Sequence, residues 1–83
     1  MRRSIDDSRD DHPEGDEERP PASWAVAISD DCDACAGERI VLTLEESGAA
    51  GLGVVGHLAP ATARRLRSAL ADALRELGQE VGR

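Results

Sequence analysis

The change of character at Pro20-Pro21 constrains the fold of this chain more than any other feature. The preceding segment carries four arginines and eight acidic residues, and Ile5 is its only large apolar residue after the first position. Such a segment cannot bury enough apolar surface to offset the conformational entropy that it would lose on ordering. The sequence therefore predicts a disordered acidic tail over residues 1–21 and a small folded domain over residues 22–83.

Three short apolar runs in the folded part have the pattern of β-strands. Residues 24–28 alternate large and small apolar side chains, and residues 39–45 place their isoleucine and two leucines on one face. A polar connection, Ser29–Glu38, links these two runs, which predicts a hairpin with a long loop. Residues 52–58 follow a turn at Ser47–Gly51 and predict a third strand. The expected sheet is a three-stranded antiparallel meander.

An amphipathic helix is expected after the strands. Pro60 stands in the first turn, where proline is tolerated, and Gly78 is a natural helix stop. Apolar side chains recur between them at spacings of three and four residues: Ala63, Leu66, Leu70, Ala73, Leu74 and Leu77. The sequence therefore predicts an α+β fold in which one C-terminal helix packs across a single face of the meander.

The second face of the expected sheet has few charges for a solvent-facing surface. Its residues would be Ala25, Ala27, Val41, Thr43, Val55 and His57. An apolar second face on a small domain predicts a homodimer, formed sheet to sheet or through an edge strand. Val41 and Val55 are candidate contacts on this face. Arg64 and Arg75, opposite the leucines of the helix, are further candidates for contact with a partner.

The first hairpin loop contains a pair of cysteines, Cys32 and Cys35, with Gly37 shortly after them. Two thiolates at this spacing can reach one tetrahedral zinc ion, so the loop resembles half of a zinc knuckle. A closed site needs four ligands. His57 on a neighbouring strand, His12 in the tail, or the cysteines of a second copy are the candidates for the others.

The same cysteines have two other interpretations. A redox dithiol is disfavoured because the pair lies between strands rather than at a helix N-terminus, and because Asp30, Asp31 and Asp33 would oppose a thiolate. The two thiols could also have no role, or could form a disulfide on oxidation.

Two patterns associated with enzymes lack the context that their chemistry needs. The glycines of Gly51-Leu-Gly53-Val-Val-Gly56 match a dinucleotide-binding pattern, but Pro60 would interrupt the helix that this motif must open. His57 has no serine or cysteine fixed beside it by local sequence. We therefore expect a non-enzymatic protein without an obligatory cofactor, and zinc is the one exception to be tested.

Charge and hydropathy limit the kinds of partner that the protein can bind and the cellular compartment in which we expect it. The net charge is −7, so the basic footprint of a nucleic-acid-binding protein is missing, and an anionic membrane surface is an equally poor partner. The sequence contains neither an apolar run long enough to cross a bilayer nor the hydrophobic core of a secretory signal. We expect a cytoplasmic protein with reduced cysteines.

The helix and the strands before it resemble a pattern found in small uncharacterised proteins of actinobacteria. The resemblance rests on Leu58-Ala-Pro60-Ala-Thr-Ala63-Arg-Arg-Leu66-Arg-Ser-Ala69-Leu70, which has the form L-x-P-x-x-A-x-x-L-x-x-A-L. It implies the strand-then-helix order and no activity. Those proteins commonly have Ser or Thr before the proline as a helix cap, whereas Ala59 stands there in this chain.

These observations favour a small non-enzymatic module for protein–protein interaction or regulation that acts as a homodimer. The alternative is a zinc-stabilised knuckle protein that uses Cys32 and Cys35, with His57 or a second chain completing the site. A small thiol redox protein is the third hypothesis.

Overall fold

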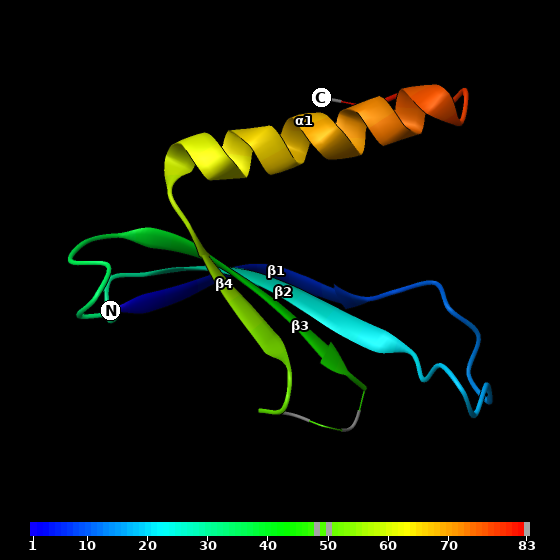
Figure 1. Cartoon of the computed structure of the whole chain (residues 1–83), viewed down its shortest axis with the longest axis horizontal. Helices are drawn as coiled ribbons and strands as arrows, with labels where there is room; N and C mark the ends of the chain where they lie inside the picture. The colour runs from blue at the N-terminus through cyan, green and yellow to red at the C-terminus, as the bar shows by residue number, and fades with distance from the viewer. Residues whose placement is uncertain (48, 50, 83) are drawn as a thin grey trace.

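A computed structural model describes residues 1–47, 49 and 51–82 of the chain. It has four antiparallel strands in the order β1-β2-β3-β4, followed by one helix (Figure 1). The elements are β1 Arg2–Arg9, β2 Ala22–Ser29, β3 Arg39–Glu46, β4 Val54–Leu58 and α1 Pro60–Glu76. The predicted α+β class with an antiparallel meander and a C-terminal helix is confirmed, and the sheet has one strand more than expected.

The additional strand, β1, lies in the segment for which the sequence predicted disorder. It pairs with β2 from Arg2 opposite Ser29 to Arg9 opposite Ser23, with an irregularity between Ser4 and Asp6. Every β1 residue is exposed, so the strand is held by backbone pairing at the sheet edge and not by apolar burial. A search for apolar periodicity has no signal to detect in such a strand.

The strands β2, β3 and β4 alternate between two faces, as the sequence predicted. Trp24 pairs with Leu44, and Leu42 pairs with both Val26 and Gly56. We call the side that carries the large apolar residues the helix-side face; it consists of Trp24, Val26, Ile28, Ile40, Leu42, Leu44, Val54 and Leu58. The opposite face carries the small residues together with Val41, Val55 and His57. The expected turn at Ser47–Gly51 includes Gly48 and Ala50, which lie outside the described residues.

Helix α1 begins and ends as its sequence predicts. Pro60 occupies the first turn, and Ala59 at the N-cap makes no side-chain capping bond. At the other end Gly78 adopts a left-handed φ of 74°. The N–H of Gly78 donates to the carbonyl of Arg75 at 2.9 Å, and the N–H of Gln79 donates to that of Leu74 at 2.9 Å. This pair of bonds is a Schellman motif, which glycine favours at this position.

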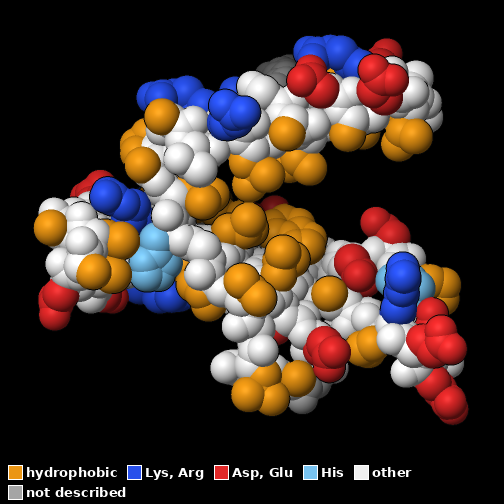
Figure 2. Space-filling model, viewed as in Figure 1, with side chains coloured by type: hydrophobic (Ala, Val, Ile, Leu, Met, Phe, Trp, Pro, Cys, Tyr) orange, Lys and Arg blue, Asp and Glu red, His pale blue; other side chains and the backbone are white. Residues whose placement is uncertain are grey.

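The helix lies over the helix-side face but covers it incompletely. Within the described residues α1 approaches β3 and β4 and not β1 or β2. Exposure along the leucine stripe does not rise steadily: it is 38%, 60%, 36% and 75% for Leu66, Leu70, Leu74 and Leu77. Figure 2 shows apolar side chains on the underside of the helix and on the sheet below it, with an open hollow between them. The expectation of a helix packed across a single face therefore holds in part, since α1 lies on that face but leaves much of its leucine stripe exposed.

The buried apolar side chains of the described residues lie on the opposite face of the sheet. They are Ala27 and Val41, at 3% and 4% exposure. None of the described helices is both long enough and apolar enough to cross a membrane.

Candidate metal centre and neighbouring surfaces

The loop between β2 and β3 curls into a turn that brings its two cysteines together. The N–H of Ala36 donates to the carbonyl of Cys32 at 3.2 Å, and Ala36 adopts a left-handed φ of 55°. At the start of the loop, the N–H of Asp31 donates to Ser29 Oγ at 3.1 Å. These local bonds hold Cys32 and Cys35 on one side of the loop, and both side chains are half-buried.

The third member of this cluster comes from a strand that is distant in sequence. His57 in β4 lies opposite Val41 in β3 and therefore on the sheet face that the loop approaches. Its Nδ1 is 3.4 Å from Cys35 Sγ. One ligand atom from each of Cys32, Cys35 and His57 lies within 4.8 Å of the other two. The structure thus brings together the three residues that the sequence proposed as metal ligands.

The two thiols have opposite electrostatic surroundings. The pKa of Cys32 is lowered, first by the backbone N–H of Cys35 and then by the Cys35 side chain, with a smaller effect from the Arg39 guanidinium. The pKa of Cys35 is raised, first by its hydrogen bond with Cys32 and then by desolvation. The sequence argument expected the nearby aspartates to oppose any thiolate. The pKa of Cys32 is nevertheless lowered, because hydrogen bonds donated to its sulfur favour the thiolate.

A shallow cavity of about 350 Å³ lies beside the cluster. Its lining comprises Arg2, Ser29, Asp31, Cys32, Arg39, Val41, Val55 and His57. Val41 forms part of its floor at 4% exposure, so it offers little surface to a partner, contrary to its predicted role as a contact. Val55 is 52% exposed and remains available on this face.

His12, the other histidine proposed as a ligand, is elsewhere. Its Nε2 lies 2.9 Å from Asp16 Oδ2, within the connection between β1 and β2. It does not belong to the cysteine cluster.

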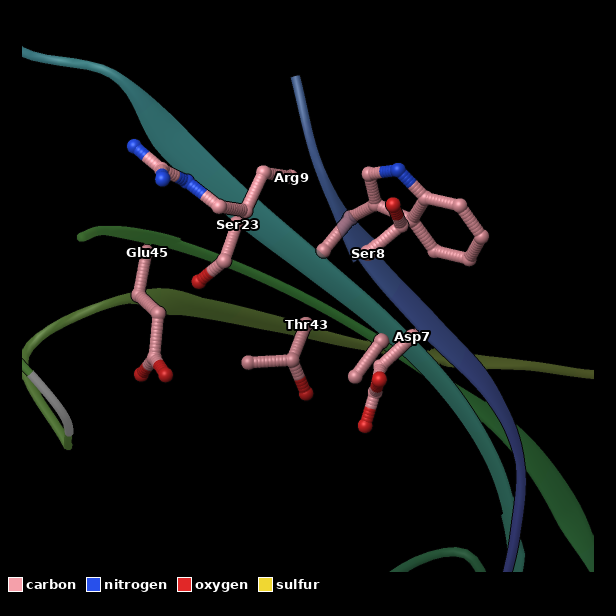
Figure 3. A pocket seen from close by; sticks show the side chains of 8 residues that line it. Asp7, Ser8, Arg9, Ser23, Thr43 and Glu45 are labelled. Atoms are coloured by element: carbon pink, nitrogen blue, oxygen red, sulfur yellow. The ribbon is translucent and has the colours of Figure 1, made fainter. Parts of the chain in front are cut away.

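A second hollow, of about 270 Å³, crosses β1, β2 and β3, and most of its lining residues are polar or charged. Figure 3 shows the side chains of Asp7 from β1 and of Thr43 and Glu45 from β3 pointing to the same side of the sheet. Glu45 Oε2 accepts a hydrogen bond of 3.1 Å from the N–H of Gly51, so this carboxylate stabilises the turn before β4. Among the described lining residues no nucleophile is hydrogen-bonded to a base, and the hollow gives no support to acid–base catalysis.

Two further hollows follow α1. The apolar cleft, of about 210 Å³, lies between α1 and the helix-side face, and it is lined by Val26, Ile40, Leu42, Leu58, Ala63, Leu66, Arg67 and Leu70. The other lies where Val81 returns along α1, and its lining includes Arg64 and Arg75. Arg75 also donates to Asp72 at 2.8 Å within the helix.

The glycines of the run that resembles a dinucleotide motif serve the turn before β4. Gly51 has a left-handed φ of 84°. A Cβ on Gly53 would collide with the Leu44 carbonyl and with Glu45. Gly56 lies inside β4 and pairs with Leu42. The run therefore leads into a strand, and not into the helix that a pyrophosphate site requires.

Comparison with known protein families, with curated proteins and with solved structures finds no match to this chain.

Proposed function

We propose that the protein is a small non-enzymatic interaction module that acts as a homodimer, and that the two copies meet at the apolar cleft. The observation that carries this proposal is the open separation between the leucines of α1 and the large apolar residues of the sheet. A single chain leaves both of these surfaces partly exposed (Figure 2).

The burial pattern supports association of two chains. Leu44, Leu70 and Leu77 are at least half exposed, although they belong to the two surfaces that the amphipathic pattern prepares for a core. A contiguous exposed apolar surface is typical of a protein–protein interface. For a domain of this size, burial within one chain is barely sufficient for folding, so a second chain adds stabilisation that the monomer lacks.

The charges along α1 favour a second copy as the occupant. Its first half carries Arg64, Arg65 and Arg67, whereas its second half carries Asp72, Arg75 and Glu76 and has a net charge of about −1. Two such helices packed antiparallel place the basic half of one beside the acidic half of the other. A symmetric pair centred on Leu70 also brings Leu66 of one helix opposite Leu74 of the partner subunit.

The sheet's opposite face is the less suitable interface. The loop that carries the cysteines approaches this face, and its buried residues, Ala27 and Val41, are already covered. Its exposed apolar contribution near the loop is Val55. The helix-side surfaces offer larger side chains, and burying each fully exposed leucine contributes about 1.5–3 kcal/mol.

Two matched substitutions test the interface. Leu70 and Val55 are 60% and 52% exposed, so a charge at either site leaves the fold of one chain largely intact. We expect sedimentation at micromolar concentration to show a dimer for the natural chain and for Val55→Glu, and a monomer for Leu70→Glu. Circular dichroism checks that both variants keep their strands.

Two results would overturn this proposal. The first is a natural chain that sediments as a monomer at high micromolar concentration. The second is a dimer that dissociates with Val55→Glu and persists with Leu70→Glu, which would place the interface on the opposite face.

A further inference from the structure

We propose that Cys32 Sγ, Cys35 Sγ and His57 Nδ1 bind one Zn²⁺ per chain, and that a water molecule in the adjacent cavity completes a tetrahedral site. This site is separate from the apolar cleft, since it lies on the opposite face of the sheet. It gives the chain a metal-binding property that the interaction module does not require.

The distances between the donor atoms suit zinc. With Zn–S bonds of about 2.3 Å and a Zn–N bond of about 2.0–2.1 Å, a tetrahedral ion sets S···N at about 3.5–3.6 Å and S···S at about 3.8 Å. The observed separation of Cys35 Sγ and His57 Nδ1 is 3.4 Å, and no pair among the three ligand atoms is farther apart than 4.8 Å. Side-chain rotations that move each sulfur atom by less than about 1 Å bring the three donor atoms to this tetrahedral geometry.

The elements that supply the donors fix their relative positions. The turn closed by the Ala36 N–H bond to Cys32 orients the two thiols, and the pairing of His57 with Val41 sets the imidazole on the same side of the sheet. Two cysteines alone would be a loop dithiol. The histidine, 22 residues from Cys35 and on a different strand, supplies a third donor that local sequence does not explain.

The chemistry of the donors selects the class of metal. Two thiolates neutralise a divalent cation, and a thiolate and imidazole set favours a thiophilic ion over Mg²⁺ or Ca²⁺, which prefer oxygen ligands. Cys32 and His57 both line the cavity of about 350 Å³, so the fourth position is open to solvent there. Three protein ligands and a water are a common zinc arrangement.

The test uses the full chain, reduced and freed of metal, with Co²⁺ as a spectroscopic probe and Zn²⁺ as competitor. We expect one Co²⁺ per chain, with the intense visible bands of a tetrahedral ion and a sulfur-to-cobalt charge-transfer band, both lost when Zn²⁺ is added. His57→Gln should weaken Co²⁺ binding at least about tenfold. His12→Gln is the matched control and should bind as the natural chain does.

Several outcomes would overturn the proposal. They are no binding at tens of micromolar Co²⁺, the weak bands of an octahedral ion, or equal binding by the His57→Gln variant. A stoichiometry of one ion for two chains would indicate a site of four cysteines shared between copies, and would also exclude the site proposed here. Thiol titration before each measurement ensures that Cys32 and Cys35 are reduced. The comparison of the natural chain with the His57→Gln variant decides whether the site exists.

Discussion

Gly53 shows how one residue fixes the entry into β4. A Cβ at this position would lie 2.9 Å from Glu45 Cα and still closer to the Leu44 carbonyl and to Glu45 Cβ. Backbone atoms cannot move aside as the end of a flexible side chain can. The close approach of the chain to β3 therefore depends on the absence of a side chain here.

Replacing this glycine should destabilise the protein. We expect Gly53→Ala to lower the free energy of unfolding by about 1–3 kcal/mol, because the end of β3 must shift to admit a methyl group. Gly56→Ala is the matched control, since its nearest neighbour, Leu58 Cδ2, is at an ordinary 3.8 Å. Urea denaturation of both variants measures the difference, and equal stabilities would show that the turn is looser than described.

At the level of residues, the sequence predicted the identity of the cysteine cluster but not its electrostatics. The spacing of Cys32 and Cys35 indicated that both thiols could reach one ion, and the strand pattern put His57 on a neighbouring strand. The direction of the Cys32 pKa could not be predicted, because it depends on where the N–H of Cys35 points. The number of charged residues near Cys32 in the sequence does not indicate the direction of this N–H.

Among the elements, β1 is the one that sequence periodicity could not find. Apolar alternation predicted β2, β3 and β4, and the spacing of three and four residues predicted α1, since each of these elements has an apolar face. Apart from Ile5, the residues of β1 are polar, and all of them are exposed. Its pairing with β2 depends on backbone hydrogen bonds, which leave no pattern in the side chains.

Removing β1 should expose the edge of β2. In a chain of residues 20–83, we expect the β2 amides that face β1 to exchange their hydrogens at least about tenfold faster than in the full chain. Amides between β3 and β4 serve as the internal control and should keep their protection. Unchanged exchange throughout β2 would mean that β1 is not paired in solution.

The truncated chain should also associate more readily. β1 carries Asp6 and Asp7 at the sheet edge, where charged side chains oppose pairing with another chain. Without this strand, the edge of the more apolar β2 is open to other molecules. Light scattering at matched concentration measures the effect.

At the scale of the whole molecule, the charges of α1 make the proposed dimer sensitive to sequence and to salt. Arg65 and Glu76 lie about three helical turns apart and so occupy the same flank of α1. In an antiparallel pair centred on Leu70, the basic half of α1 that holds Arg65 lies alongside the half of the partner helix that holds Glu76, although both side chains point away from the leucine stripe. Attractions between such exposed charges contribute about 0.2–1 kcal/mol each and are screened by salt.

Reversing one of these charges should weaken the dimer, and reversing both should restore it. Symmetry repeats the contact twice, so we expect Glu76→Arg to raise the dimer Kd by about two- to thirtyfold at low salt. The double variant Glu76→Arg with Arg65→Glu should return close to the natural value. Sedimentation at two salt concentrations measures both, and a double variant weaker than the single one would exclude the antiparallel arrangement.

The α+β fold class could be predicted from the sequence, because apolar alternation is typical of a strand and apolar spacings of three and four residues are typical of a helix. The extent of helix packing could not, because it depends on the direction in which the chain leaves β4. Leu66 and Leu74 are better covered than Leu70 and Leu77, although all four belong to the same stripe. The apolar pattern indicates which side chains tend to be buried. The path of the backbone determines whether a single chain can bury them.

Because a single residue, Ala59, joins β4 to α1, the helix is attached to the sheet at one end only. Its first residue, Pro60, follows β4 directly after Ala59, as Figure 1 shows, whereas Leu77, just past its other end, is 75% exposed. A partner that fills the apolar cleft contacts both α1 and the sheet, so it also fixes the angle between them. Binding should therefore reduce the motion of the C-terminal end of α1 more than that of the strands.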